Sequence, residues 1–361
     1  NEFQYGQTAG WPGLRKVLAK RLVKKDKLNC ISGEEDWEKV LISTGSQQAI
    51  YLALDILINP GDIVITPSPA YLGFVTTVVK VGGHVVTAPT DNEGLIPEYV
   101  EDTIIKAEKK FGRKVKILYV VEDSDNPKGT TLPVKRREQL FDIAERHDVI
   151  VICDAAYKEM QFEERKPSMK TLDKDNERVI YTSTSSKEAA PIRIGYTIMP
   201  DYLFTEAEKS KGYLDLCTPT LTQRVAEIYY DKHIDTELPK IVQKYKEQKD
   251  AAYNGLIETF PEGDFTNPSG GFFIWYQPKG EKAFTFDVRK FNQEVLMPNE
   301  VLVVPGAAFY PPSGHSYDPE ARDIEPLKVI TGGMRIGYSF VSKELIDVGV
   351  RKLGNLLKEN L

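Results

Sequence analysis

The sequence predicts an α/β fold: a large domain with a mainly parallel sheet wrapped by helices, followed by a smaller C-terminal α+β domain. Three observations lead to this prediction. Short apolar, β-branched runs alternate with helical stretches up to about residue 200. Two of these runs, 115–121 and 149–153, are apolar at almost every position, as expected of strands buried on both faces. A long helical pattern then begins near residue 220, and we place the domain boundary inside it, giving domains 1–245 and 246–361.

The expected elements alternate along the chain. The first is a helix with a proline near its start, WPGLRKVLAKRLVKK (11–25). The expected strands are KVLIST (39–44), DIVITPSP (62–69), HVVTAP (84–89), VKILYVV (115–121) and VIVICDAAY (149–157). The helices between them are QQAIYLALDILI (47–58), YLGFVTTVVKVG (71–82) and the amphipathic KRREQLFDIAERHD (135–148). The second domain adds a helix over 223–260, strand-like pieces at 272–277, 301–306 and 334–340, and a closing amphipathic helix at 343–361.

The composition is that of an ordinary globular protein. Of its 361 residues, 41% are hydrophobic and 28% are charged, which argues against long disordered segments. The net charge of −6 gives no basic excess that would favour nucleic acid as a partner. No apolar run approaches the roughly 18–20 residues of a membrane helix. We therefore expect a protein that binds neither nucleic acid nor membranes.

Cysteine and histidine usage indicates a reducing compartment and no metal. Three widely separated cysteines fit a reducing compartment better than a disulfide framework, and no charged-then-apolar leader opens the chain. The four histidines lack the spacing of metal ligands: His84, His147, His233 and His315. We expect a cytoplasmic protein without a bound metal.

Polar residues follow several of the expected strands, where doubly wound sheets bind their ligands. Gly45 and Ser46 join a strand to a helix, so that free backbone N–H groups there could hold an anion. Asn126 follows the strand 115–121, and Asp154 follows the run 149–153. Each has an ordinary alternative: a common turn at Gly45–Ser46 and at Asn126, and a helix cap at Asp154.

The stretch YTSTSSKEAAPIRIGYTIM (181–199) places Lys187 after five hydroxyl residues and Arg193 six residues later. A lysine among hydroxyls can be ordinary surface or a covalent anchor beside a bound anion. Together with the strand ends, the second reading fits an aromatic cation that carries a phosphate and an aldehyde, which is pyridoxal phosphate. Such a ligand needs hydroxyls and an arginine for the phosphate (Ser46, Thr184, Ser186, Arg193), a buried carboxylate for the ring nitrogen (Asp154), an amine for a Schiff base (Lys187) and a stacking face (Tyr71).

These motifs, in their order along nearly the whole chain, resemble the fold type I pyridoxal-phosphate enzymes, in particular the class I/II aminotransferases. YGQTAGWPGLR is similar to the family's opening motif. STGSQQA, with Gly45, Ser46 and Gln47, is similar to its phosphate turn, and PAYLGF to its ring-stacking tyrosine. DNPKGT, DAAYKEM, TSSKEAAPIRIGY and GGMRIGYSF are similar to its NPxG, DxxY, SxSK…RxGY and C-terminal arginine motifs.

The resemblance implies a role for each matching residue. Lys187 would form the imine with the cofactor, and Asp154 would pair with the ring nitrogen. Asn126 and Tyr157 would bond the ring hydroxyl. Arg335, with Asn126, would bind the α-carboxylate of the substrate.

Three features depart from the family pattern. Arg193 lies six residues after Lys187, one fewer than in many relatives, which leaves its reach to the phosphate open. Thr184 replaces the commoner serine three residues before the lysine and keeps the hydroxyl. The approach to DNPKG is acidic, and it is either a solvated or arginine-paired face or a contact for an amine-bearing substrate: Glu122, Asp123 and Asp125.

The resemblance implies an aminotransferase that moves an amino group from an L-amino acid to a 2-oxo acid, 2-oxoglutarate in particular. Lys187 would be the general base, and Asp154 would keep the ring nitrogen protonated. One alternative is a pyridoxal-phosphate lyase acting on amino acids on the same scaffold. Another is a non-catalytic effector-sensing domain, which in other proteins is fused to a DNA-binding winged helix. Formation of glutamate from an amino acid and 2-oxoglutarate would separate an enzyme from a sensor.

The stretch 303–333 before Arg335 is predicted to be a long loop rich in proline, glycine and charge. Because Phe309, Tyr310 and Tyr317 lie in it, an aromatic or long-chain substrate is one interpretation. A surface insertion with ordinary aromatic residues is the other.

The resemblance also implies an obligate homodimer with shared active sites, in which Tyr5 reaches the cofactor phosphate of the neighbouring subunit. Family members carry several dozen residues before this motif, usually an N-terminal arm and part of the small domain. We therefore expect an N-terminal arm to precede residue 1.

Overall fold

The computed structural model describes residues 4–361, and its largest element is a ten-stranded sheet. Its strands lie in the order β1-β8-β7-β6-β5-β2-β3-β12-β13, with β4 paired to β3. Their bounds are β1 Leu41–Ser43, β2 Ile63–Ser68, β3 His84–Asp91, β4 Gly94–Leu95, β5 Val115–Val121, β6 Ile150–Asp154, β7 Val179–Thr184, β8 Gly195–Ile198, β12 His315–Asp318 and β13 Asp323–Pro326. The strands from β3 through β2, β5 and β6 to β7 are parallel, and β8 is antiparallel to its neighbours. The mainly parallel α/β sheet predicted from the sequence is confirmed.

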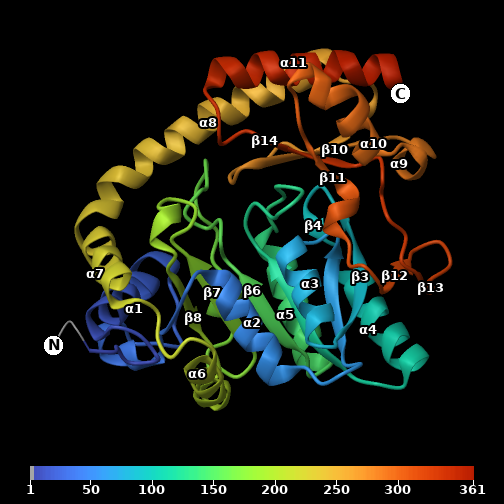
Figure 1. Cartoon of the computed structure of the whole chain (residues 1–361). Helices are drawn as coiled ribbons and strands as arrows, with labels where there is room; N and C mark the ends of the chain where they lie inside the picture. Colours follow the sequence, from blue (N-terminus) through green and yellow to red (C-terminus); the bar gives the residue numbers. More distant parts are fainter. Residues whose placement is uncertain (1–3) are drawn as a thin grey trace.

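Helices cover both faces of this sheet (Figure 1). The helices α2 (Ser46–Leu57), α3 (Leu72–Lys80) and α6 (Asp201–Leu214) pack on one face, and α1 (Pro12–Asp26), α4 (Pro97–Phe111) and α5 (Val134–Arg146) on the other. Successive side chains of a strand point to opposite faces, so one strand serves both cores. In β2, Ile63 and Ile65 are buried in one core and Val64 in the other. This explains why the central strands are apolar at almost every position.

A second, antiparallel sheet has the order β11-β14-β10-β9. Its strands are β9 Gly263–Phe265, β10 Phe273–Pro278, β11 Val304–Pro305 and β14 Met334–Gly337. The helices α8 (Ile234–Thr259) and α11 (Lys343–Asn360) pack together, and their apolar residues share a third core with this sheet. Figure 1 shows α8 running from α7 (Thr220–Ile228), beside the large sheet, up to α11. The remaining short helical turns are Glu34–Lys39, Met169–Thr171, Ala190–Ile192, α9 Lys282–Thr285, α10 Val288–Phe291, Asn292–Leu296, Met297–Asn299 and Gly306–Phe309.

Two regions differ from the sequence expectations. The helix expected over 223–260 is divided into α7, a π-helical segment Tyr229–His233, and α8. The loop expected over 303–333 contains the β12–β13 hairpin, and His315 and Ser316 of β12 pair with Val86 and Thr87 of β3. The hairpin is held there because Tyr317 and Ile324 are buried in the core of the large sheet. The C-terminal part of the chain thus adds strands to both sheets, and the boundary at 245, inside α8, stays a prediction.

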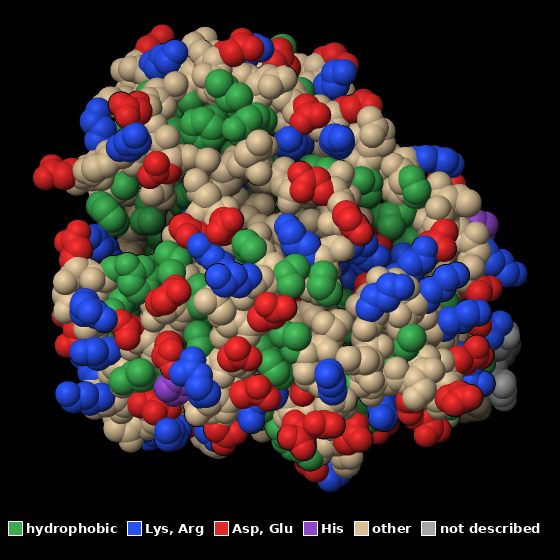
Figure 2. All heavy atoms as spheres, turned by 180° about the vertical axis from the view of Figure 1, so that it is seen from behind, with side chains coloured by type: hydrophobic (Ala, Val, Ile, Leu, Met, Phe, Trp, Pro, Cys, Tyr) green, Lys and Arg blue, Asp and Glu red, His purple; other side chains and the backbone are tan. Residues whose placement is uncertain are grey.

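Acidic and basic side chains alternate over much of the face shown in Figure 2, with small hydrophobic patches between them. Within residues 4–361, no helix is both long and apolar enough to cross a membrane. Over the same residues, no cluster of three or more histidine, cysteine or acidic side chains is arranged to hold a metal ion.

Candidate active site

The turn between β1 and α2 forms a cradle of free backbone N–H groups. Gly45 has a φ of +77°, a conformation that favours glycine, and α2 begins at Ser46, so the first N–H groups of the helix lack intrahelical partners. A Cβ atom on Gly45 would lie 2.7 Å from Arg193 Nη2. A Cβ atom on Gly195 would lie 2.4 Å from the carbonyl carbon of Gly45. Glycine at both positions therefore lets β8 and Arg193 approach the helix N-terminus, which attracts anions.

Arg193 reaches this cradle despite its short spacing from Lys187. Its φ of +55° turns the chain back at the start of β8, and Nη1 donates a hydrogen bond to Ser186 Oγ at 2.7 Å. Ser186 N–H donates to Thr184 Oγ1 at 3.1 Å, and this hydroxyl in turn donates to the carbonyl of Ile194 at 2.9 Å. The structure thus gathers a guanidinium, the Ser186 hydroxyl and free N–H groups, donors that suit a phosphate, whereas the Thr184 hydroxyl donates within the turn.

Asp154 lies at the end of β6 and is only 4% exposed. Its Oδ2 accepts a hydrogen bond from Tyr119 Oη at 2.8 Å, and its Oδ1 accepts one from the N–H of Ala156 at 3.1 Å. Burial raises the pKa of Asp154, while the Tyr119 hydrogen bond and the charge of Lys187 oppose the rise. A desolvated carboxylate gains most from a cation beside it, which a protonated pyridine ring would supply.

One cavity brings several of these groups together. It is lined by Ser46, Tyr71, Tyr119, Val121, Asn126, Asp154, Ala156, Tyr157 and Lys187. Lys187 Nζ lies 4.7 Å from the centre of the Tyr157 ring. Burial lowers the pKa of Lys187, and Asp154 and Tyr71 oppose the effect. A lowered pKa increases the neutral fraction of the amine, which is the nucleophilic form.

A larger hollow, with an empty volume of about 990 Å³, lies on the other side of β6 and is lined by Asp26, Lys158, Arg165 and Tyr181 among others. Two of its cations, the buried Lys158 and the half-buried Arg165, pair with Asp26. It lacks the combination of amine, carboxylate and anion cradle, so the smaller cavity is the candidate active site.

Gln47 supports Tyr71 with its side chain instead of facing the cradle. Tyr71 Oη donates a hydrogen bond to Gln47 Oε1 at 3.0 Å. Gln47 Nε2 donates to the carbonyl of Gly73 at 3.1 Å and to Thr77 Oγ1 at 3.2 Å. Both ends of the amide are therefore committed to the Tyr71 side of the cavity, which leaves the backbone N–H of Gln47 for an anion at the helix N-terminus.

Arg335 approaches from the second sheet, on β14. Its Nη1 donates a hydrogen bond to Asn126 Oδ1 at 2.7 Å. Its guanidinium carbon lies 4.0 Å from the centre of the Phe273 ring and 5.1 Å from that of Phe309. Within residues 4–361, its Nε is buried and has no hydrogen-bond partner. A guanidinium with an unused N–H is suited to bind a carboxylate.

The acidic segment before DNPKG is buried and paired, because an unpaired charge is costly in a protein interior. Glu122 lies 3.6 Å from Arg137 Nη1, and Asp123 accepts a hydrogen bond from Arg137 Nη2 at 2.6 Å. Asp125 accepts hydrogen bonds from the N–H and the hydroxyl of Thr130 at 2.9 and 3.0 Å. The arginine-paired alternative is therefore correct for the first two residues. The solvated alternative is wrong, and the segment offers no exposed carboxylate to a substrate amine.

Tyr5 and Tyr317 lie away from the cavity. Tyr5 is 83% exposed on the outside of the chain. Tyr317 was one of the aromatic residues expected near the substrate. It belongs to the large sheet instead, and its Oη donates a hydrogen bond to Asp102 of α4 at 2.8 Å. Conversely, the site contains Tyr119 and Phe273, which sequence reasoning missed. Tyr119 is the one tyrosine in the otherwise largely aliphatic strand 115–121, and this was the sequence signal that could have identified it as a site residue.

Comparisons with known proteins identify the family of the chain. The family model "Aminotransferase class I and II" matches residues 1–316. Aromatic-amino-acid aminotransferase 1 of Thermococcus litoralis is 33% identical over 99% of this chain and 80% of its own length. The crystal structure of Pyrococcus horikoshii kynurenine aminotransferase matches with a TM-score of 0.87 and 33% identity, over 100% of this chain and 83% of that chain. An uncharacterized HTH-type transcriptional regulator of Bacillus subtilis is 28% identical over 99% of this chain and 68% of its own length. The chain therefore belongs to the class I and II aminotransferases, pyridoxal 5′-phosphate enzymes of fold type I.

Proposed function

We propose that this aminotransferase moves the amino group of an L-amino acid to a 2-oxo acid such as 2-oxoglutarate, with Lys187 as its covalent cofactor anchor. The carrying observation is that a half-buried lysine, a buried aspartate and Ser46 of the anion cradle line one cavity, with Arg335 of the second sheet bonded to Asn126 of its lining. The bound pyridoxal phosphate supplies an aromatic ring that accepts the electron pair left when the substrate Cα loses its proton.

The residues on the large sheet are proposed to hold the cofactor. Arg193, Ser186 and the N–H groups at the start of α2 supply the donors for its phosphate. Asp154 keeps a proton on the ring nitrogen, and the Tyr119 hydroxyl fixes the orientation of that carboxylate. Asn126 and Tyr157 line the same cavity and are our candidates for the ring hydroxyl.

Lys187 and Arg335 are proposed to act on the substrate. The neutral amine of Lys187, favoured by burial, can accept the Cα proton and return it to a neighbouring carbon. The Arg335 fork holds the α-carboxylate and so fixes the direction of the Cα–H bond relative to the ring. This orientation selects proton loss over decarboxylation.

We propose an aromatic or long-chain amino donor. Phe273 and Phe309 both lie against the guanidinium of Arg335, so a bound substrate would find apolar rings beside its carboxylate group. The names of two relatives, an aromatic-amino-acid and a kynurenine aminotransferase, describe donors of this kind.

A homodimer that shares its active sites is part of the proposal. The segment after Tyr5 lies beside the ends of two helices, since a Cβ on Gly6 would lie 2.8 Å from Thr220 Oγ1 and a Cβ on Gly212 would lie 3.8 Å from Thr8 Cγ2. Next to these positions, Leu221 is 77% exposed and Tyr213 is 94% exposed. A second copy of the chain could cover this surface and bring its own Tyr5 to the cradle. An active monomer in analytical ultracentrifugation would contradict shared sites.

The test is a panel of amino donors incubated with 2-oxoglutarate, with glutamate formation measured. We expect aromatic donors to give the highest kcat/KM. A pyridoxal-phosphate lyase would release a product without needing the oxo acid. A sensor would bind the amino acid, with a change in cofactor absorbance, and form no glutamate.

A further inference from the structure

Glu188 directly follows Lys187 but faces a different part of the molecule. Its Oε1 accepts a hydrogen bond from Tyr230 Oη at 2.8 Å. In the part of the chain that the structure describes, its Oε2 is buried and has no hydrogen-bond partner. Lys187 lines the cavity, whereas Glu188 is absent from its lining. The two neighbouring side chains therefore connect the cavity to a separate, buried polar cluster.

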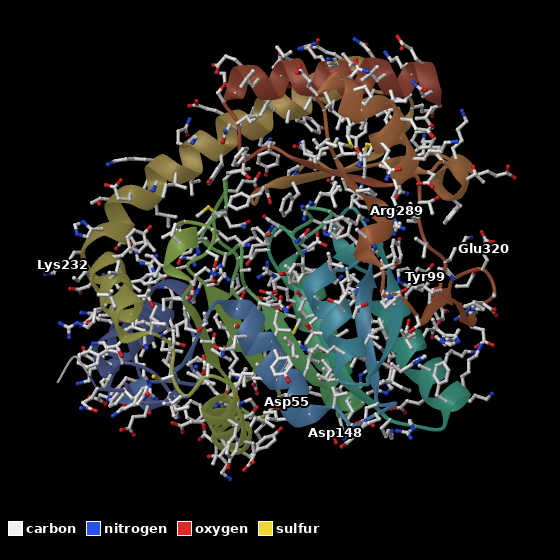
Figure 3. All side chains as sticks on the ribbon, viewed as in Figure 1. Asp55, Tyr99, Asp148, Lys232, Arg289 and Glu320 are labelled. Atoms are coloured by element: carbon white, nitrogen blue, oxygen red, sulfur yellow. The ribbon has the colours of Figure 1, made fainter. Side chains whose placement is uncertain are left out.

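Tyr230 belongs to the π-helical segment Tyr229–His233, between α7 and α8. Figure 3 marks this segment by Lys232, which lies at the outer edge of the molecule. Tyr230, by contrast, is only 5% exposed and packs edge-to-face on Tyr196 of β8, with ring centres 6.1 Å apart. Single π-helical turns inside a helix are often found at functional sites. Here the turn directs the Tyr230 hydroxyl to the residue after the candidate anchor lysine.

The turn that carries Lys187 begins at the end of β7. Ser185 N–H donates to the carbonyl of Ile194 at 2.9 Å, and Ala189 N–H donates to the carbonyl of Ser185 at 2.7 Å. Glu188 adds a side-chain hydrogen bond from this turn to the helix that leads into the second sheet. A reacting group has to be held in place, since a misplacement of about 1 Å can lower a rate by about 100-fold.

We propose that Glu188 is a positioning residue for Lys187, and that its hydrogen bond with Tyr230 fixes the lysine turn to the π-helical segment Tyr229–His233. This inference rests on the proposed role of Lys187 as the cofactor anchor.

Titratable groups from several elements face Glu188 or its immediate neighbours. They are Lys158 and Glu159 after β6, Tyr196 of β8, Tyr229 and Tyr230 of the π-helical segment, and Lys187 on the same turn. Arg21 forms an ion pair with Glu159, and Asp235 forms one with Arg21. Burial, and then the charge of Glu159, raise the pKa of Glu188 to about 7. Because the pKa of Glu188 in the folded protein is above its ordinary value of 4.5, Glu188 stabilises the fold most below pH 4.5. This stabilisation is lost as the pH rises through about 7.

The test compares four variants of the holoenzyme. Glu188→Ala and Tyr230→Phe each remove the hydrogen bond from one side, and each should lower kcat about tenfold with KM unchanged. The double variant should be no slower than either single variant, because the two changes remove the same contact. The matched control is Tyr229→Phe. It removes the hydroxyl of the neighbouring tyrosine, which has no hydrogen-bond partner within residues 4–361. It should retain wild-type kcat.

Two readouts separate positioning from packing. Visible circular dichroism of the bound cofactor should change in Glu188→Ala and Tyr230→Phe but not in Tyr229→Phe. In the apoprotein, Glu188→Gln keeps the acceptor oxygen and removes the charge, so its Tm should fall less than that of wild type between pH 4.5 and pH 7, the ordinary value and the pKa of Glu188.

Additive losses in the double variant would overturn the inference. So would a lower Tm in Glu188→Ala with unchanged kcat and dichroism, because Glu188 would then serve packing alone. Failure of the proposed function is a distinct result: Lys187→Ala would keep the absorbance of the covalently bound cofactor.

Discussion

The two sides of the cavity are built differently. On the large-sheet side, Asp154, Ser186 and Arg193 are fixed by hydrogen bonds to neighbouring groups of the protein. On the small-sheet side, Arg335 makes one hydrogen bond, to Asn126, and its buried Nε has no partner within residues 4–361. If the proposed roles hold, the cofactor side is organised in advance, whereas the substrate side would gain a hydrogen bond when a carboxylate binds.

This difference has an energetic consequence. A buried, unsatisfied donor costs about 1–3 kcal/mol. A carboxylate that accepts from Arg335 Nε removes this cost, so part of the substrate's affinity comes from relieving it. Residues on the large-sheet side should therefore control chemistry, and Arg335 should control binding.

The largest effect is expected for Lys187→Ala. Loss of a general base typically lowers the rate by about 10²–10⁴-fold, and loss of the covalent anchor should add to this. Turnover and the absorbance of the covalently bound cofactor should both disappear, while circular dichroism in the far ultraviolet stays unchanged. Lys166→Ala, on the rim of the larger hollow, is the control and should keep wild-type turnover.

Asp154→Asn should follow, with a loss in kcat of about 10²–10³-fold and little change in substrate affinity. The asparagine keeps the size of the side chain but cannot hold a positive charge on the ring nitrogen. Stopped-flow measurement of substrate binding and of the following step would separate the two. If binding weakened and the later step kept its rate, the contrast between the two sides of the cavity would be wrong.

Arg335→Lys should raise KM by about 10–100-fold for every donor and change kcat less. The lysine keeps the charge but loses the fork that holds a carboxylate with two N–H groups. The measurement is steady-state kinetics with several donors. A change confined to one donor would show that Arg335 contacts the substrate side chain instead of the shared carboxylate.

Tyr119→Phe should have the smallest effect, a loss of about 2–10-fold in kcat. It removes one hydrogen bond to Asp154, whose usual net contribution is about 0.5–1.5 kcal/mol. The pKa of Asp154 should rise further, because this hydrogen bond lowers it. The pH profile of kcat would detect the shift, and an unchanged profile would remove Tyr119 from the account.

The sequence allowed most of the large sheet to be predicted, because strands buried on both faces are apolar at nearly every position. It also indicated which polar residues follow those strands, and Ser46, Asn126, Asp154 and Lys187 do line one cavity. In a parallel sheet such residues meet at the same edge, so local pattern was sufficient.

Features that depend on distant partners could not be predicted. The burial of Glu122 and Asp123 depends on their pairing with Arg137. The apolar pattern predicts the helix that carries Arg137, but it does not show which residues the side chains of that helix contact. Gln47 is committed to Tyr71, 24 residues away. The β12–β13 hairpin joins the large sheet from the C-terminal part of the chain, where Tyr317 and Ile324 are buried in the core of that sheet, a contact that local sequence does not reveal.

The central claim is that Lys187 anchors the cofactor beside Asp154. The most direct test is borohydride reduction of the holoenzyme followed by peptide mapping, because reduction fixes the cofactor to the lysine that holds it. We predict one labelled peptide, carrying the label on Lys187. A label on another lysine, such as the buried Lys158 on the far side of β6, would contradict the account.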